Sequence, residues 1–141
     1  MTVEYAGGCI CGAVRYRCSA EAIFAANCHC RDCQRATGSA FAAMLFVPRQ
    51  SVTISGDVTY YAVTGDSGNP VRRGFCPRCG ARLFSIPSPE ILLADLLAIS
   101  AGSLDEPSRY QPTMDIYTMS AQAWDPMNPE LSKFTTFPQA S

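Results

Sequence analysis

The most informative stretch of this chain is "FCPRCG", which runs from Phe75 to Gly80. Two cysteines separated by two residues can bring two thiolates onto one metal ion, and Gly80 allows the backbone to turn back where a side chain would clash. This pattern is typical of a zinc knuckle. Because two thiolates leave a tetrahedral zinc ion half coordinated, the sequence predicts a second pair of ligands elsewhere in the chain.

A second pair lies in "GGCICG", Gly7–Gly12. In extended backbone Cys9 and Cys11 project to the same face, and the surrounding glycines permit a bend that draws their sulfurs together. Four sulfurs at about 2.3 Å complete a closed structural zinc site. We therefore predict that Cys9, Cys11, Cys76 and Cys79 hold one structural zinc ion and tie the N-terminus to the middle of the chain. A different pairing of the cysteine clusters stays open.

The third cluster, "NCHCRDC", spans Asn27–Cys33 and contains three cysteines and the only histidine of the chain. It could be a disulfide staple, a redox pair, a closed metal site or a metal site with a vacant position. Three thiolates suffice to hold zinc and leave its fourth position open, as in catalytic zinc sites. We favour this last interpretation, with Cys28, Cys30 and Cys33 as ligands of a catalytic zinc.

The remaining residues of this cluster allow other roles. Cys30 and Cys33 form a C-x-x-C pair, but the βαβ pattern of a thioredoxin-like redox protein is missing. His29 lies between two ligands and should point to the opposite face, either to make a core hydrogen bond or to line the substrate pocket. Cys18, the isolated eighth cysteine, is predicted to be a buried small apolar residue.

Charge sharpens the prediction of an open site. Zinc with three thiolates carries a net charge of −1, so nearby cations are needed if another anion is to bind. Four arginines lie near the cysteines in sequence, and they are Arg31, Arg35, Arg72 and Arg73. Three thiolates weaken zinc as a Lewis acid but still allow it to hold an incoming thiol as thiolate. The chemistry therefore favours a thiol substrate.

Composition limits the class of protein. The 141 residues predict a single domain, and 48% hydrophobic content fits a globular core. No apolar run approaches the ~20 residues of a membrane span, and the N-terminal residues resemble no signal peptide, so we expect a cytoplasmic protein with reduced thiols. The net charge of −1 gives no indication of nucleic-acid binding.

Short alternating segments predict a mainly β fold. "GAVRYRC" should form a half-buried strand and "SAFAAMLFV" a strand that ends at Pro48, whereas "SVTIS" and "VTYYAVT" should form a hairpin that turns at Gly56-Asp57. Strands are also expected in "VRRGF", "ARLFSI", "LLAISAG" and "MDIYTMSAQAW", with a loop over 65–70. Helical turns are expected in "CQRATGS" and "IPSPEILLADLL", and an irregular tail over 125–141.

Five stretches resemble the glutathione-dependent formaldehyde-activating enzyme family, which includes the centromere protein V relatives. They are "GGCICGAVRY", "NCHCRDCQRATGSAF", "SGNPVRRGFCPRCGARLF", "AGSLDEP" and "AQAW", spread over residues 7–124. The resemblance implies an Mss4-like fold of two curved antiparallel sheets stapled by zinc, in one zinc-binding domain over 1–141. It also implies two zinc ions per chain, bound by the structural and catalytic cysteines named above.

The implied reaction joins glutathione and formaldehyde into S-hydroxymethylglutathione, the reverse of a carbon–sulfur lyase reaction, so a small thiol and an aldehyde are the expected partners. Arg31, Arg35 and Arg73 are candidates for binding the glutathione carboxylates. Many members of the family carry a late histidine where this chain has Asp115. A non-catalytic zinc-stabilised binding module and a thiol redox or metal sensor remain alternative functions, and a homodimer is left open.

Overall fold

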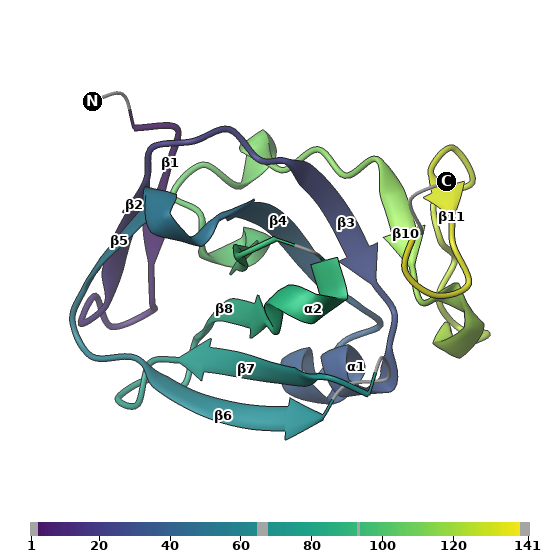
Figure 1. The fold of residues 1–141 in the computed structure, drawn as a ribbon, viewed down its shortest axis with the longest axis horizontal. Helices are drawn as coiled ribbons and strands as arrows, with labels where there is room; N and C mark the ends of the chain where they lie inside the picture. The colour runs from purple at the N-terminus through teal and green to yellow at the C-terminus, as the bar shows by residue number, and fades with distance from the viewer. Residues whose placement is uncertain (1–2, 65–67, 93, 139–141) are drawn as a thin grey trace.

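Two β-sheets make up most of the fold in the computed structural model, which describes residues 3–64, 68–92 and 94–138 (Figure 1). The small sheet has the order β1-β2-β5, and the large sheet has the order β11-β10-β3-β4-β9-β8-β7-β6. The small sheet consists of β1 (Tyr5–Gly8), β2 (Arg15–Cys18) and β5 (Val52–Ser55). The large sheet consists of β3 (Phe24–Cys28), β4 (Ala42–Pro48), β6 (Thr59–Thr64), β7 (Pro70–Phe75), β8 (Arg82–Pro87), β9 (Leu96–Ser100), β10 (Met114–Ile116) and β11 (Ser132–Lys133).

This architecture confirms the predicted mainly β, two-sheet fold. The small sheet is antiparallel throughout, and β2 shows the alternation seen in the sequence, with Tyr16 and Cys18 buried and Arg15 and Arg17 exposed. The large sheet is antiparallel from β3 to β6, but β10 pairs in parallel with both β3 and β11. In Figure 1 the large sheet curves from β3 at the top of the view to β6 at the bottom.

The predicted hairpin between "SVTIS" and "VTYYAVT" is wrong. The segments form β5 and β6, but β5 pairs with β2 in the small sheet and β6 pairs with β7 in the large one. Gly56 lies between them with a φ of 95°, and a Cβ there would lie 2.0 Å from the main-chain oxygen of Ala13. The glycine therefore allows the chain to pass close to another segment and enter the second sheet instead of reversing within the first.

The large sheet separates two hydrophobic cores, because successive side chains of a strand point to opposite faces. In β4, Leu45 and Val47 enter the core shared with the small sheet, and Met44 and Phe46 enter the core on the other face. The first core includes Tyr16, whose ring lies 5.2 Å from that of Phe84. The second core contains Cys28, Cys30 and Cys33. Each cysteine cluster therefore borders a core of its own.

The helices are short. Helix α1 (Arg31–Thr37) overlaps the predicted turn "CQRATGS" but begins two residues earlier, and it ends at Gly38, whose φ of 69° forms a left-handed cap. Helix α2 (Pro89–Leu92) falls in the second predicted helical turn, and 3₁₀ turns occupy Arg49–Ser51, Ala101–Ser103, Pro107–Arg109 and Thr118–Ser120. Within the described ranges, no helix is long and apolar enough to cross a membrane.

The end of the chain is more ordered than its composition predicts. The expected strand "MDIYTMSAQAW" stops after Ile116, because Tyr117 adopts a φ of 54°. The tail expected to be irregular contributes β11, and Phe134 and Phe137 pack against the second core. The predicted loop over 65–70 lies partly outside the described residues, as does the last part of the tail.

Candidate metal centres

The first cluster brings together the two turns that the sequence paired. Cys9 and Cys11 follow β1, Cys76 and Cys79 lie between β7 and β8, and their four sulfurs all lie within 4.8 Å of one another. The sulfurs of Cys9 and Cys11 are 3.6 Å apart, and those of Cys11 and Cys76 are 3.8 Å apart. Four sulfurs placed tetrahedrally at about 2.3 Å from zinc would be about 3.8 Å apart. The cluster therefore fits a tetrahedral ion.

Main-chain hydrogen bonds also stabilise the thiolate form of cysteines in this cluster. The N–H groups of Val14 and Arg78 donate to the sulfurs of Cys9 and Cys76 over 3.3 and 3.4 Å. Main-chain hydrogen bonds at Ala81 and Cys11 lower the pKa of Cys79 to about 6. Since hydrogen bonds to a thiolate favour the charged form, the turn stabilises the state that binds metal.

The second cluster is formed by Cys28, Cys30 and Cys33, whose sulfurs also lie within 4.8 Å of one another. Cys28 ends β3, Cys30 is the N-cap of α1, and Cys33 lies in the first turn of that helix. Their exposed fractions are 5%, 7% and 2%, respectively. In the described part of the chain, no other His, Cys, Asp or Glu side chain joins these three cysteines within that distance. The cluster therefore offers an ion three protein ligands.

Hydrogen bonds within this cluster distribute the protons unequally. The thiols of Cys28 and Cys33 donate to the sulfur of Cys30, and together with the Cys33 main-chain N–H at 3.2 Å they lower the pKa of Cys30 to about 2. The same hydrogen bonds, together with burial, raise the pKa of Cys28 well above its ordinary value. A metal ion that binds here must displace protons from the other thiols, so binding is coupled to pH.

Arg73 supplies positive charge directly at this cluster. It lies on β7, its exposed fraction is 9%, and both Nη atoms lie 3.7 Å from the sulfur of Cys33. Its Nε is buried and has no hydrogen-bond acceptor among the described residues. Burial lowers the pKa of Arg73, but the neighbouring sulfurs of Cys33 and Cys30 outweigh this effect and keep it above its ordinary value.

The two other arginines named from the sequence lie elsewhere. Arg31 and Arg35 are exposed on α1, and Arg31 donates to the side-chain oxygen of Gln34. Gln34 in turn is buried and donates to the main-chain oxygens of His29 and Ser120 over 2.8 and 3.0 Å. The structure therefore brings only Arg73 of the three into contact with the sulfurs of the second cluster.

His29 points away from the cysteines and is fully buried. Its Nε2 forms a 2.7 Å hydrogen bond with Asp115 Oδ1, and its Nδ1 lies 2.8 Å from Asp125 Oδ2. Lys133 Nζ lies 2.9 Å from the other oxygen of Asp115. Burial raises the pKa of Asp115, but His29 and Lys133 outweigh that effect and the pKa lies below its ordinary value. Sequence reasoning missed Asp125, for which the sequence carries no local signal.

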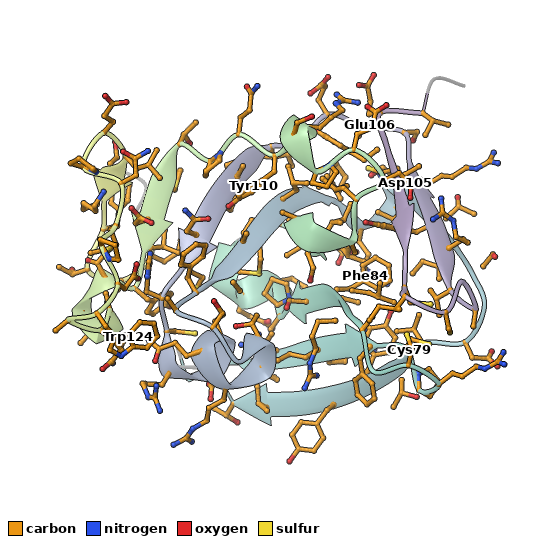
Figure 2. All side chains as sticks on the ribbon, turned by 180° about the vertical axis from the view of Figure 1, so that it is seen from behind. Cys79, Phe84, Asp105, Glu106, Tyr110 and Trp124 are labelled. Carbon is orange, nitrogen blue, oxygen red and sulfur yellow. The ribbon has the colours of Figure 1, made fainter. Side chains whose placement is uncertain are left out.

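The two clusters border different cores of the fold. Figure 2 labels Cys79 of the first cluster, which lies on the opposite side of the view from Trp124, the neighbour of Asp125. Comparison with protein families identifies one match: the model of the glutathione-dependent formaldehyde-activating enzyme family matches residues 4–120 of this chain. The chain belongs to this family. The matched range contains all seven cysteines of the two clusters.

Two individual relatives extend the comparison. A Schizosaccharomyces pombe protein named as an uncharacterized lyase is 32% identical over 81 residues, which cover 57% of this chain and 56% of that protein. The chain thus spans just over half the length of that family relative. A crystal structure of a Rhodobacter sphaeroides protein superposes with a TM-score of 0.56 and 16% identity, covering 92% of this chain and 99% of that one. This second likeness supports the fold.

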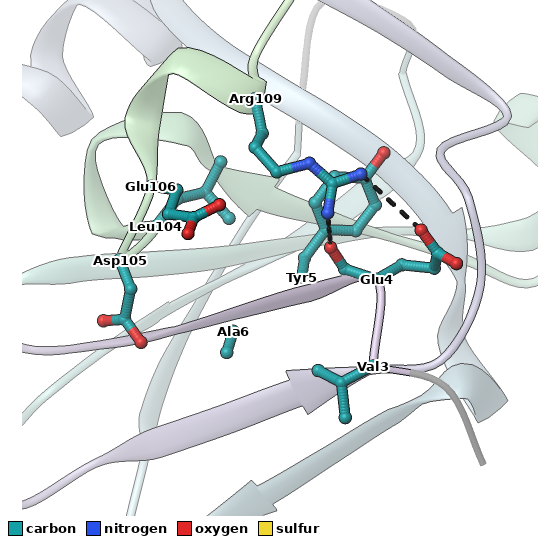
Figure 3. A pocket seen from close by; sticks show the side chains of 8 residues that line it. All are labelled: Val3, Glu4, Tyr5, Ala6, Leu104, Asp105, Glu106 and Arg109. Carbon is teal, nitrogen blue, oxygen red and sulfur yellow. Dashed lines mark hydrogen bonds and ion pairs between the residues drawn. The ribbon is translucent and has the colours of Figure 1, made fainter.

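Two hollows outside the thiolate clusters border other parts of the family fold. A groove of about 280 Å³ runs from Gly8 and Ile10, beside the first cluster, to Thr37 at the end of α1. A pocket of about 230 Å³ lies beside β1, where Arg109 contacts Glu4 and covers the ring of Tyr5 at 4.7 Å (Figure 3). Neither of these two hollows is lined by a cysteine.

Proposed function

We propose that this chain is a zinc-dependent carbon–sulfur lyase that acts on a thiol adduct, with glutathione and formaldehyde as its most favoured reactants. The observation that carries the proposal is the second cluster, where three buried cysteine sulfurs lie together and one of them contacts a buried guanidinium. Family membership supports the reaction class, and the name of the Schizosaccharomyces pombe relative agrees with it. In this proposal the protein acts in the cytoplasm and binds a low-molecular-weight thiol.

The two clusters divide the metal-binding roles. Cys9, Cys11, Cys76 and Cys79 would complete the coordination of a structural zinc ion, whereas Cys28, Cys30 and Cys33 would hold a second ion and leave one position for an exchangeable ligand. A zinc ion at the second cluster would lower the pKa of a bound thiol and stabilise it as the thiolate nucleophile. The proposed cofactor content is two zinc ions per chain.

Arg73 compensates charge at the second cluster. Three thiolates and a divalent cation sum to −1, so a further thiolate would raise the negative charge to −2. The guanidinium of Arg73, at 3.7 Å from the Cys33 sulfur, offsets one of these charges where burial excludes water. We assign Arg73 this role, and we assign the exposed Arg31 and Arg35 to the outer carboxylates of a glutathione-like substrate.

The protein must then bring the thiol and the aldehyde together. The thiolate attacks the aldehyde carbon, a carbon–sulfur bond forms, and the aldehyde oxygen takes up a proton to give the hydroxymethyl thioether. Holding both partners in reactive geometry is the main source of rate enhancement for such an addition. The buried Nε–H of Arg73 is a donor still without an acceptor among the described residues, and it is suited to the oxygen that gains negative charge.

Exchange spectroscopy tests the activity. Two-dimensional exchange NMR on glutathione with ¹³C-formaldehyde, with and without protein, measures how fast the adduct forms and breaks. We expect acceleration by the wild-type protein and by Arg49→Met, which removes an exposed arginine that contacts Asp95, and loss of acceleration in Cys28→Ser and Arg73→Met. If the wild-type protein accelerates no exchange with any of several thiols while holding a single zinc ion, the chain is a zinc-stabilised binding module or a thiol sensor instead.

A further inference from the structure

The turn that carries two of the three thiolates of the second cluster is held at all four polar groups of His29. The main-chain N–H of His29 donates to the oxygen of Ile116 over 3.0 Å, and its main-chain oxygen accepts from Gln34 over 2.8 Å. On the ring, Nε2 contacts Asp115 at 2.7 Å, and Nδ1 contacts Asp125 at 2.8 Å. The backbone between Cys28 and Cys30 is therefore fixed from several directions.

The contact with Asp125 differs in kind from the contact with Asp115. The Asp115 carboxylate forms a hydrogen bond with the ring, whereas the geometry at Nδ1 is that of an ion pair without a hydrogen bond. Both carboxylates are almost fully buried, with side-chain exposed fractions of 2% and 6%. Each ring nitrogen of His29 therefore lies within 2.8 Å of a buried carboxylate oxygen. Lys133 Nζ lies 2.9 Å from the second oxygen of Asp115 and holds that carboxylate from the other side.

The segment that supplies these partners lies late in the chain. The family model ends at residue 120, so Asp125 and Lys133 lie beyond the region matched by the family. This late segment is tied down independently of His29, because Phe134 N donates to the oxygen of Asp115 over 2.9 Å and Phe137 packs against Phe24 at a ring distance of 5.8 Å. These contacts hold the late segment in place, so that it can restrain His29.

We propose that residues 125–133 form a clamp that fixes the Cys28–His29–Cys30 turn and thereby sets how long a metal ion stays at the second cluster. Asp125 and Asp115 act as positioning residues, through His29, and touch neither metal nor substrate. The inference rests on the proposed function in one respect, namely that the second cluster holds a metal ion. Supports of this kind around metal ligands change metal affinity about 10–100-fold when they are removed.

The clamp also gives a role to Asp115, which stands where the resemblance described above implies a histidine in many members. Asp115 is 1% exposed, and its two oxygens face His29 and Lys133. A residue enclosed in this way cannot face a substrate bound at the sulfurs. In this chain Asp115 therefore helps to hold the turn from Cys28 to Cys30, and its partner Lys133 in β11 belongs to the same clamp.

Metal release from the two-site protein tests the clamp. Zinc-loaded wild-type protein, Asp125→Asn and the control Asp95→Asn are mixed with a chromophoric chelator, and the two release phases are followed. Asp95→Asn removes an exposed carboxylate that contacts Arg49 at 2.9 Å and leaves the second core untouched. We expect Asp125→Asn to accelerate the faster phase about tenfold and to leave the slower phase unchanged, and Asp95→Asn to change neither.

A spectroscopic readout separates positioning from general destabilisation. With ¹¹³Cd in place of zinc, each cluster gives its own NMR resonance, and Asp125→Asn should shift only the resonance of the three-thiolate site. Unchanged release and an unchanged resonance in Asp125→Asn, with two ions bound by the wild-type protein, would overturn the clamp alone. A wild-type protein that binds a single ion would overturn both the clamp and the proposed function. If Asp125→Asn folds poorly, the same measurements on Lys133→Met decide between these outcomes.

Discussion

The substitution Cys76→Ser should destabilise the protein far more than Cys28→Ser, although both remove a buried thiolate. Cys76 has an exposed fraction of 0% and belongs to the cluster that joins the β1–β2 turn to the β7–β8 turn. Because those turns belong to different sheets, an ion at the first cluster fastens the sheets together. The second cluster lies within one continuous segment of 28–33 and fastens only the start of α1.

The size of the effect follows from zinc binding coupled to folding. A structural zinc site contributes about 10–16 kcal/mol of apparent binding free energy in small zinc-dependent domains, or about 2.5–4 kcal/mol for each of four thiolates if they share it equally. Domains are stable by about 5–15 kcal/mol in all. The share of one thiolate, about 3 kcal/mol, is therefore the smallest loss expected from Cys76→Ser and corresponds to a fall in Tm of at least about 10 °C for a chain of this size; loss of the whole ion makes the fall larger.

The assay combines calorimetry with elemental analysis on zinc-loaded protein. We expect Cys76→Ser to lose the tightly held ion together with the fall in Tm, and Cys28→Ser to lose the other ion with a fall of less than half that amount. Equal Tm values for the two variants, or two ions retained by Cys76→Ser, would refute the assignment of the first cluster as the structural site.

Three further predictions test the fold and its charges. Ile99→Ala, at a position with 0% exposure in the first core, should lower the free energy of unfolding by about 2–5 kcal/mol in urea titrations. Gly56→Ala should cost at least about 2 kcal/mol more than Gly38→Ala, because only the Cβ at position 56 would collide with a backbone oxygen, and paired melting curves measure the difference. The pKa of Asp115 is lowered in the fold, so its stabilising contribution is present above its unfolded pKa of about 3.9 and is lost as pH falls through the folded value. Asp115→Asn should accordingly flatten the loss of stability as pH falls below about 3.9, as followed by urea midpoints.

The metal clusters could be predicted from sequence because ligand spacing is local. Each pair in C-x-C or C-x-x-C already places two sulfurs together. Because zinc takes four ligands, the two pairs can combine into one complete site, and the group of three cysteines is left as a separate site. The half-buried strand β2 was predictable for a similar reason, since the alternation of Tyr16 and Cys18 with two arginines reports directly on the two faces of a strand.

Pairing between distant segments could not be predicted in the same way. The turn signal at Gly56-Asp57 shows where the chain bends but carries no information about which sheet each flanking strand joins. His29 and Asp115 are separated by 86 residues, and β10 reaches β3 in parallel, a pairing that alternation along one strand does not encode. Arg73 was recognised as a candidate cation, but only the register of β7 distinguishes it from the exposed arginines of α1.

The exposure of the two centres is the reverse of what a simple division into interior scaffold and accessible active site would suggest. Cys11 of the four-thiolate cluster is exposed, whereas the three cysteines of the other cluster are buried in the second core. A fully coordinated ion has no position for water, so exposure costs it little. An ion with an open position benefits from apolar surroundings, because excluded water cannot compete for that position and the charge of Arg73 acts at low dielectric. The burial of the second cluster is therefore consistent with chemistry at that site, and the large sheet gives each centre the surroundings that its coordination requires.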